Sequence, residues 1–230
     1  MGYTHYWYRP TIIPDAVFAA IRNDFGRMIL PLSDAGIELA GGVGEGPPEI
    51  TDDVIVFNGV DECRHPLSDE LVIPYPSEHA QGIGPSSTAI DGSFYDLGVT
   101  VKHRCCNGHC SFETFRLEKQ KVSSANQASD ENGLHCEYVK TAFRPYDVAV
   151  TCILLIAKRH LRDQFVIHSN GADAQWSDAR RICQLVLGYG DWFGIIEQRI
   201  EENWKGVEGS TESREVILRT LEEIEPSKLA

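Results

Sequence analysis

A dense group of potential metal ligands lies between residues 103 and 110. It comprises two histidines and three cysteines: His103, Cys105, Cys106, His109 and Cys110. Zinc prefers thiolate and imidazole ligands, and four of them complete a structural site. Asn107-Gly108, however, is a strong signal for a two-residue hairpin turn. In a flat hairpin Cys106 faces His109 on one side. Cys105 then faces Cys110 on the other side, so each face offers only a pair of ligands.

The hairpin therefore does not complete a metal site, and we expect neither a metal nor another cofactor. If a metal is bound, the expected ligands are Cys105, Cys106, His109 and Cys110. Such a site needs a knuckle in place of the flat turn, or help from a distant residue such as Cys63, His65 or Cys136. A zinc-stabilised module is thus one alternative for the whole protein. A Cys105–Cys110 disulfide is not expected in a reducing compartment.

A second group combines basic residues with the start of a predicted helix. Lys140 and Arg144 come just before Tyr146 and Asp147. A helix N-terminus attracts anions through its free N–H groups and its dipole. These residues therefore predict an anion pocket within an otherwise acidic chain. The alternative is that Arg144 forms an ion pair that fastens a strand to the helix.

A third group has the residue types that acid–base catalysis requires. Glu113 and His168 lie on predicted strands, where a carboxylate and an imidazole can act as general acid and base. With His5 and Lys140 they form the set that we expect to be catalytic. The alternative for His168 is that it only caps a strand end. The sequence contains no nucleophile elbow, no pair of metal-binding histidines and no catalytic cysteine motif.

Further polar and aromatic residues at predicted strand and helix ends are expected to contact the ligand: Tyr6, Trp7, Asn58, Arg144 and Tyr146. In the first predicted strand, residues 2–9, His5 and Trp7 share one face and Tyr6 the other. The strand could instead be an edge strand whose rings cover a helix. Asn58 could instead only supply the Asn-Gly turn that ends its strand.

The elements that position these residues centre on residues 145–162. Apolar side chains cover almost the whole circumference of this predicted helix, which indicates a buried helix. A strand over 165–168 and an amphipathic helix over 176–187 follow, the helix ended by glycines. The remaining predicted elements are a helix from Pro14 that Pro31 breaks or kinks, strands over 37–40, 53–59 and 135–140, a hairpin over 99–117, and helices around 192–200 and 216–224. The glycine run 41–46 lacks the Lys-Ser/Thr of a phosphate loop and predicts a surface loop.

This order predicts an α+β fold, with helices packed on one face of a mostly antiparallel sheet. The simplest version is a ferredoxin-like βαββαβ core with an inserted β-hairpin and C-terminal helices. Residues 1–190 form one predicted domain, within which residues 61–96 are a long loop or lid and residues 118–133 a loose loop. Residues 191–230 are expected to be an acidic helical extension, which packs on the core or binds a partner.

Charge and cysteine content limit the partners. The net charge is −13, which argues against a general attraction to nucleic acid or to anionic membranes. Seven cysteines in a chain whose N-terminus lacks a secretion signal indicate a reduced, cytoplasmic protein. We expect a small-molecule ligand, no nucleic acid and no membrane, and the sequence allows a homodimer.

Several segments belong to a recognisable set: GYTHYW at the start, FNG at 57–59, FETF at 112–115, KTAFRPYD at 140–147 and LGYG at 187–190. Together they resemble an uncharacterised family of hypothetical proteins from phages, bacteria and some fungi. The resemblance covers most of the chain outside residues 61–96 and the tail. That family has no known activity, so the resemblance implies no catalytic residues. It implies that these polar-aromatic segments belong to one framework, and the cysteine-rich hairpin tip falls outside them.

The sequence thus predicts an enzyme without a redox cofactor, acting by acid–base chemistry on a small anionic or aromatic substrate. A lyase, isomerase, cyclase or hydrolase would fit this description. The alternative is a non-catalytic module that binds a small ligand or another protein.

Overall fold

The computed structural model describes residues 3–63, 106, 108–121, 133–196 and 199–202. Its helices are α1 (Asp15–Asp34), α3 (Asp147–Leu161) and α4 (Ser177–Leu187). Its strands are β1 (Thr4–Arg9), β2 (Leu39–Ala40), β3 (Glu49–Ile50), β4 (Val54–Gly59), β5 (Phe115–Glu118), β6 (His135–Lys140), β7 (Val166–Ser169), β8 (Phe193–Ile196) and β9 (Arg199–Glu202). All strand pairs are antiparallel, so the predicted α+β class with antiparallel sheets is confirmed.

The larger sheet has five strands in the order β6-β1-β7-β9-β8. β1 pairs antiparallel with both β6 and β7, so these two strands run parallel to each other on either side of it. α3 connects them along the chain. Tyr6 lies opposite Tyr138 on one side and opposite His168 on the other. Three strands thus bring these side chains into one row across the sheet.

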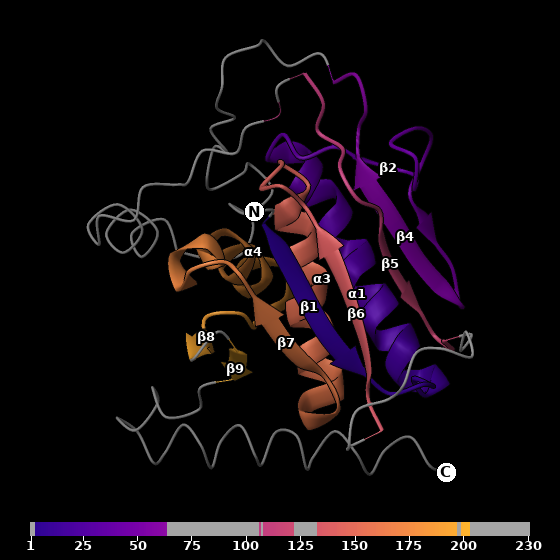
Figure 1. The fold of residues 1–230 in the computed structure, drawn as a ribbon, viewed down its shortest axis with the longest axis vertical. Coiled ribbons are helices and arrows are strands. Elements are labelled where there is room, and N and C mark those ends of the chain that lie inside the picture. The colour runs from indigo at the N-terminus through magenta and orange to yellow at the C-terminus, as the bar shows by residue number, and fades with distance from the viewer. Residues whose placement is uncertain (1–2, 64–105, 107, 122–132, 197–198, 203–230) are drawn as a thin grey trace.

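The smaller sheet is built around β4, which pairs with β2, β3 and β5. Its strand β5 lies beside β6 of the larger sheet (Figure 1). The Glu113 N–H, just before β5, donates to the Lys140 carbonyl at the end of β6 with an N···O distance of 3.3 Å. At the other end, the buried Arg9 side chain donates to the backbone carbonyls of Glu118 and Lys119. The two sheets are therefore joined at both ends of β5.

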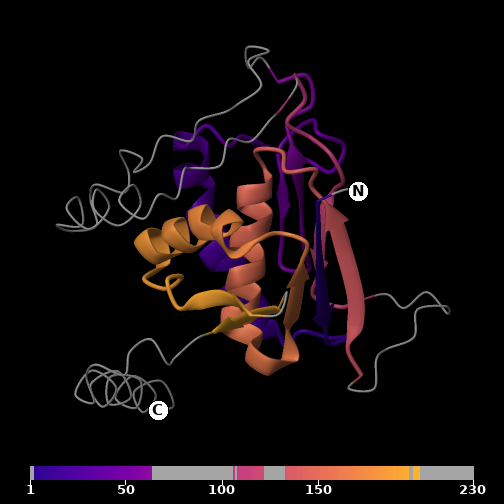
Figure 2. The same ribbon diagram turned by 60° about the vertical axis from the view of Figure 1, so that its left-hand side comes forward.

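The three helices lie together on one side of the larger sheet (Figures 1 and 2). α3 is buried along nearly its whole length, from Asp147 to Lys158, as its apolar sequence predicted. It packs between α1 and α4 and against β7. Trp7, Val139 and Ile167 point from β1, β6 and β7 into this core. The opposite side of these strands carries no helix of the described residues, and we call it the open face.

The structure differs from two of the predictions about helices. α1 continues through Pro31 to Asp34, so Pro31 does not end the helix. The predicted alternative, a kink at Pro31, stays a prediction. The helix predicted around residues 192–200 is replaced by strands β8 and β9, which extend the larger sheet beyond β7. The helix predicted over 216–224 lies outside the described residues.

The predicted hairpin around Asn107-Gly108 is described only in part, since residues 99–105 and 107 lie outside the described residues. The turn itself is present: the His109 N–H donates to the Cys106 carbonyl at 2.8 Å, and Gly108 has φ of 80°. Residues 108–114 contain no strand, and β5 begins only at Phe115. No helix of the described residues has the length and apolar character that crossing a membrane requires.

Candidate functional sites

Strand alternation along β1 divides the predicted site between two faces. His5 and Trp7 point toward the helices and are buried. Tyr6 and Tyr8 point to the open face and are half-buried. Of the residues predicted to form one site, Tyr6, Glu113, Lys140 and His168 belong to the open face or its rim. His5, Trp7 and Tyr146 are buried, and their contacts differ accordingly.

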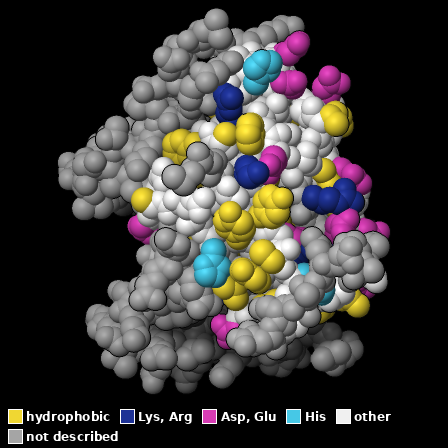
Figure 3. All heavy atoms as spheres, viewed as in Figure 1, with side chains coloured by type: hydrophobic (Ala, Val, Ile, Leu, Met, Phe, Trp, Pro, Cys, Tyr) yellow, Lys and Arg dark blue, Asp and Glu magenta, His cyan; other side chains and the backbone are white. Residues whose placement is uncertain are grey.

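The open face carries a group of aromatic side chains. The Tyr6 and Tyr138 ring centroids are 6.0 Å apart, and those of Tyr8 and His168 are 5.7 Å apart in an edge-on arrangement. Tyr138 is 59% exposed, and its neighbours on the same side of β6, Cys136 and Lys140, are exposed as well. Figure 3 views this side of the molecule and shows hydrophobic side chains gathered over β6, β1 and β7. Such an exposed aromatic surface is typical of a binding site.

Lys140 and Glu113 lie at the upper rim of the open face, where the two sheets meet. The Lys140 Nζ is 3.4 Å from a Glu113 carboxylate oxygen and 5.9 Å from the Tyr138 ring centroid. The other Glu113 oxygen accepts the Lys140 backbone N–H at 2.7 Å. Beneath them, the Tyr146 hydroxyl donates to the Glu113 carbonyl at 2.7 Å. Burial, with a smaller effect of the neighbouring Asp147, raises the pKa of Tyr146, so this hydroxyl stays protonated and acts as a donor.

A cleft of about 220 Å³ opens between β5 and β6, next to the aromatic surface. We call it the cleft, and its lining residues are Trp7, Thr114, Arg116, Glu118, Cys136, Glu137 and Tyr138. The Trp7 side chain is almost fully buried, and its Nε1–H donates to Glu137 at 2.9 Å. Tyr138 belongs to both the cleft and the open face, so the two form one continuous surface.

Each charged side chain that lines the cleft already has a charged partner. The Arg116 Nε lies 2.8 Å from a Glu118 carboxylate oxygen. The Lys121 Nζ lies 2.9 Å from the Glu137 carboxylate. The cleft therefore offers rings and compensated charges, and a ligand would meet little net electrostatic attraction.

On the helix side of the sheet, His5 is the centre of a buried polar network. Its Nε2 is 2.8 Å from Asp147 Oδ1, and its Nδ1 is 3.0 Å from Ser169 Oγ. The Thr141 hydroxyl donates to the same Asp147 oxygen at 2.6 Å. We call His5, Thr141, Asp147 and Ser169 the buried network, because each of these side chains is at most 3% exposed.

Ser169 has further hydrogen-bond partners within the core. The Ser169 Oγ accepts hydrogen bonds from the Gly171 N–H at 2.9 Å and from the Trp176 Nε1–H at 3.4 Å. With two donors directed at it, the hydroxyl can donate its own hydrogen to His5 Nδ1. Serine, histidine and aspartate are the residues of a hydrolase triad, but burial keeps a substrate away from this serine. The network therefore fixes β1, β7 and the start of α3 to one another.

Two further predicted ligand-binding residues are engaged by the backbone. The Asn58 side chain donates to the carbonyls of Gly42 and Phe112 and accepts the N–H groups of Phe112 and Gly59. This amide thus ties three chain segments together. Arg144 donates to the carbonyl of Cys106, so its guanidinium anchors the cysteine-containing turn to the segment before α3.

Three cysteines form a cluster beside that turn. The Sγ atoms of Cys63, Cys106 and Cys110 all lie within 4.8 Å of one another. We call them the thiol cluster. Burial is the largest cause of a raised pKa at Cys110, and its hydrogen bond with Cys63 adds to this effect. The predicted ligand Cys105 lies outside the described residues. His109 is engaged elsewhere, with its Nδ1 2.7 Å from Asp61.

Tyr138 is not among the site residues predicted from the sequence, and Cys63 is predicted only as a distant additional ligand of a metal site. Tyr138 had a recognisable signal, because Cys136, Tyr138 and Lys140 alternate along one predicted strand as β1 residues do. Cys63 had no local signal, since its partners are more than forty residues away in the sequence.

Comparisons of the chain with protein-family models, with curated proteins and with solved structures found no match.

Proposed function

We propose that this protein binds a small, uncharged aromatic ligand at the cleft and on the adjoining open face. The observation that carries the proposal is the position of Tyr138, which is exposed, contacts Tyr6 and also lines the cleft. A planar ligand in the cleft would stack on Tyr138 and cover the edge of the Tyr6 ring. Aromatic pairs with this kind of geometry contribute about 0.5–1.5 kcal/mol beyond the area that they bury.

The paired charges favour an aromatic ligand over an anionic one. Each of the nearest cations has an acidic or carbonyl partner: Lys140 has Glu113, Arg116 has Glu118, and Arg144 has the Cys106 carbonyl. An anion would have to displace one of these partners, while the net charge of −13 would repel it. Of the two substrate classes that the sequence predicts, the aromatic one therefore fits this surface better.

The size of the cleft limits the ligand to one or two rings. Pockets for drug-sized molecules have volumes of roughly 300–1,000 Å³, whereas the cleft has about 220 Å³. The open face can support a ring that extends out of the cleft toward Tyr6. A ligand of the size of naphthalene would use both parts of the surface.

A binding experiment with two matched probes tests the proposal. 2-Naphthol and 2-naphthoate share a ring system but differ in charge, and isothermal titration calorimetry measures their affinities. We expect 2-naphthol to bind more tightly. Tyr138→Ala should weaken its binding about ten-fold, because a lost stacking contact of about 1.4 kcal/mol corresponds to this factor.

Leu30→Ala is the matched control for the loss of exposed apolar surface, since Leu30 is 56% exposed on α1, on the helix side of the sheet. It should leave the affinity unchanged. Tighter binding of 2-naphthoate, or equal losses in the Tyr138 and Leu30 variants, would contradict the proposal.

A second candidate function is acid–base catalysis on the bound ligand. It is favoured by the ionisable groups on the same side of the sheet: Glu113, Lys140 and His168. A general acid or base must reach the reacting proton directly or through one water, and these side chains border the aromatic surface. If the protein is an enzyme of this kind, the buried network holds the strands of the site in place and takes no part in catalysis.

Deuterium exchange into 2-tetralone, a planar ketone with acidic C–H groups, tests this second candidate. NMR in D₂O would measure the exchange rate with the protein and in buffer alone. Catalysis predicts faster exchange with the wild-type protein and a loss of this acceleration in His168→Ala or Lys140→Ala. Equal rates with and without protein would leave only the binding function.

We also propose that β1, β6 and β7, with α3 connecting β6 to β7, belong to a ferredoxin-like core. The support is that β1 lies between two parallel strands connected by a helix, as in the split βαβ unit of that fold. A cytoplasmic location is also our proposal, supported by the free thiols of the described residues. The predicted homodimer remains a prediction.

A further inference from the structure

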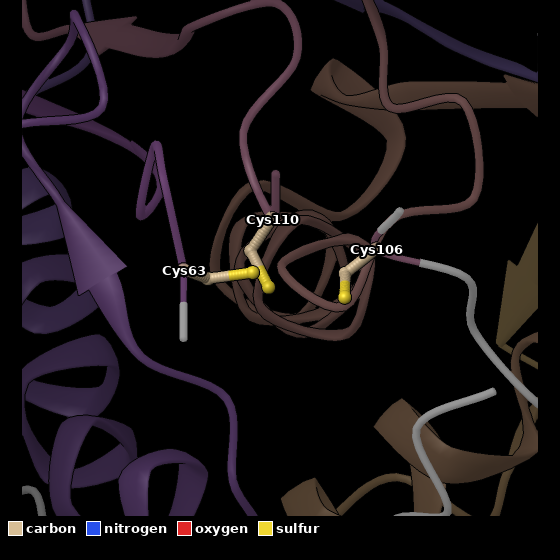
Figure 4. Close-up of side chains that lie close together, drawn as sticks. All are labelled: Cys63, Cys106 and Cys110. Atoms are coloured by element: carbon tan, nitrogen blue, oxygen red, sulfur yellow. The ribbon is translucent and has the colours of Figure 1, made fainter. Parts of the chain in front are cut away.

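The thiol cluster brings together two segments that are distant in the sequence. Cys63 follows β4, whereas Cys106 and Cys110 precede β5. Cys106 and Cys110 are buried, Cys63 is partly buried, and all three Sγ atoms lie within 4.8 Å of one another. Figure 4 shows the three side chains turned toward one common region. A flat hairpin would place Cys106 and Cys110 on opposite faces, whereas in the structure both contribute to the same cluster.

Backbone contacts hold these segments together without help from the thiols. The Cys110 N–H donates to the Val60 carbonyl at 3.0 Å, and the Cys106 carbonyl accepts from His109 N–H and from Arg144. At Gly59 the two segments of the chain approach so closely that a Cβ atom added there would lie 2.0 Å from the Cys110 carbonyl oxygen. The sulfur atoms therefore converge on a framework that is already fixed.

We propose that Cys63, Cys106 and Cys110 bind one zinc ion. Zinc–sulfur bonds of about 2.3 Å in a tetrahedral site place sulfur atoms about 3.8 Å apart, which the spacing of the cluster allows. Thiolates are soft ligands that select zinc over hard cations such as Mg²⁺ or Ca²⁺. Three thiolates leave one position of the ion for a further ligand.

The surroundings suit the charge of such a site. Zinc with three thiolates carries a net charge of −1, and the Arg144 guanidinium, bound to the Cys106 carbonyl, provides a nearby positive charge. His109 Nδ1 lies 2.7 Å from Asp61 Oδ1 at the protein surface. Among the described residues only the three cysteines form the cluster. The ion would join the end of β4 to the segment that leads into β5, next to the start of α3.

Zinc content measured on single variants tests this inference. The full chain is expressed with added zinc, and zinc per chain is measured by elemental analysis and by native mass spectrometry. We expect one zinc ion in the wild-type protein and its loss in Cys63→Ser, Cys106→Ser and Cys110→Ser. Even an altered partner outside the coordination sphere typically lowers metal affinity by about 10–100-fold, so losing a ligand should exceed this. Cys136→Ser, which changes an exposed thiol on β6, should retain the ion.

A second measurement applies to the wild-type protein and does not depend on how the variants fold. Replacing zinc by Co²⁺ should give a thiolate-to-cobalt charge-transfer band and the intense visible bands of a tetrahedral site. Wild-type protein with neither zinc nor this cobalt spectrum would overturn the inference. Retention of zinc by all three serine variants, or a Cys63–Cys110 disulfide in the freshly isolated protein, would also overturn it. Neither result affects the proposed ligand site, which uses other residues.

Discussion

Two histidine–aspartate pairs lie in very different surroundings. His5 and Asp147 are fully buried, whereas His109 and Asp61 are about half exposed, although the contact distances are 2.8 and 2.7 Å. Removing one partner of a buried pair leaves the other polar group without its hydrogen bond in the core. The same change at the surface is compensated by water.

We therefore predict that His5→Ala lowers the free energy of unfolding by about 3–5 kcal/mol, because the buried Asp147 carboxylate loses its histidine partner. His109→Ala should lower it by less than about 1 kcal/mol. Urea denaturation followed by circular dichroism measures both changes. Similar losses for the two variants would show that the buried network does not support the fold.

Asp24 gives a prediction for pH dependence. Burial alone would raise the pKa of this carboxyl, but hydrogen bonds from His160 and Tyr189 outweigh it and lower the pKa below its ordinary value of 3.8. The unfolded chain then binds a proton more readily than the folded one. Asp24 should stabilise the fold at neutral pH, and this contribution should be lost as the pH falls below about 4.

Asp24→Asn should remove this contribution and flatten the acidic side of the stability profile. Urea midpoints measured from neutral pH down to about pH 3 would show the change. Asp15→Asn is the control, because Asp15 also lies on α1 but is 90% exposed. If the wild-type and Asp24→Asn profiles keep the same slope in acid, the hydrogen bonds of Asp24 do not affect its protonation.

At the scale of elements, the end of β4 packs closely against the segment around Cys110. A side chain at Gly59 would collide with the Cys110 carbonyl, whereas at Gly26, on the exposed side of α1, nothing lies within 4 Å of the added Cβ. A glycine-to-alanine substitution can therefore be compared at a closely packed position, Gly59, and at an exposed one, Gly26.

Gly59→Ala should destabilise the protein by about 1–3 kcal/mol, since overpacking forces the backbone apart. Gly26→Ala should stabilise it by about 0.5–1 kcal/mol, because alanine favours a helix interior over glycine. Thermal or urea denaturation measures both. If Gly59→Ala were neutral, the segment at Cys110 would not be held against β4 as the structure shows.

The elements that the sequence predicted best are those with an unambiguous apolar pattern. α3 is apolar all round and α4 has a clear stripe ended by Gly188, whose φ of 81° is the conformation that glycine favours. By contrast, residues 192–200 contain isoleucines whose spacing suits a helix or two short strands. Pairing of β9 with β7 decides between them, and a pairing between distant strands leaves no local mark in the sequence.

The candidate sites show the same limit. Alternation along β1 placed His5 and Tyr6 on opposite faces correctly, but it could not show that helices would cover the His5 side. The hairpin geometry also misjudged the cysteines, because it treated residues 105–110 as an isolated ribbon. Cys63 reaches the cluster through the contact of β4 with the segment before β5, which is a tertiary contact.

At the scale of the whole molecule, two sheets meet along β5 and β6 and enclose the cleft between them. Hydrogen bonds join the sheets near Glu113 and near Glu118, while the middle of β5 and β6 lines the cleft. The helices cover one side of the larger sheet, so the aromatic residues of the other side remain available. The thiol cluster would brace the same junction from the end of β4.

Mapping of the binding surface by NMR tests the central claim most directly. The backbone amide spectrum of the ¹⁵N-labelled protein is recorded during a titration with 2-naphthol. We predict that the amide signals of Tyr6, Arg116, Tyr138 and their strand neighbours shift during the titration. The amide signals of α1 and α4 should keep their chemical shifts. Shifts confined to the helices, or no shifts at ligand concentrations that saturate calorimetric binding, would contradict a ligand site between β5 and β6.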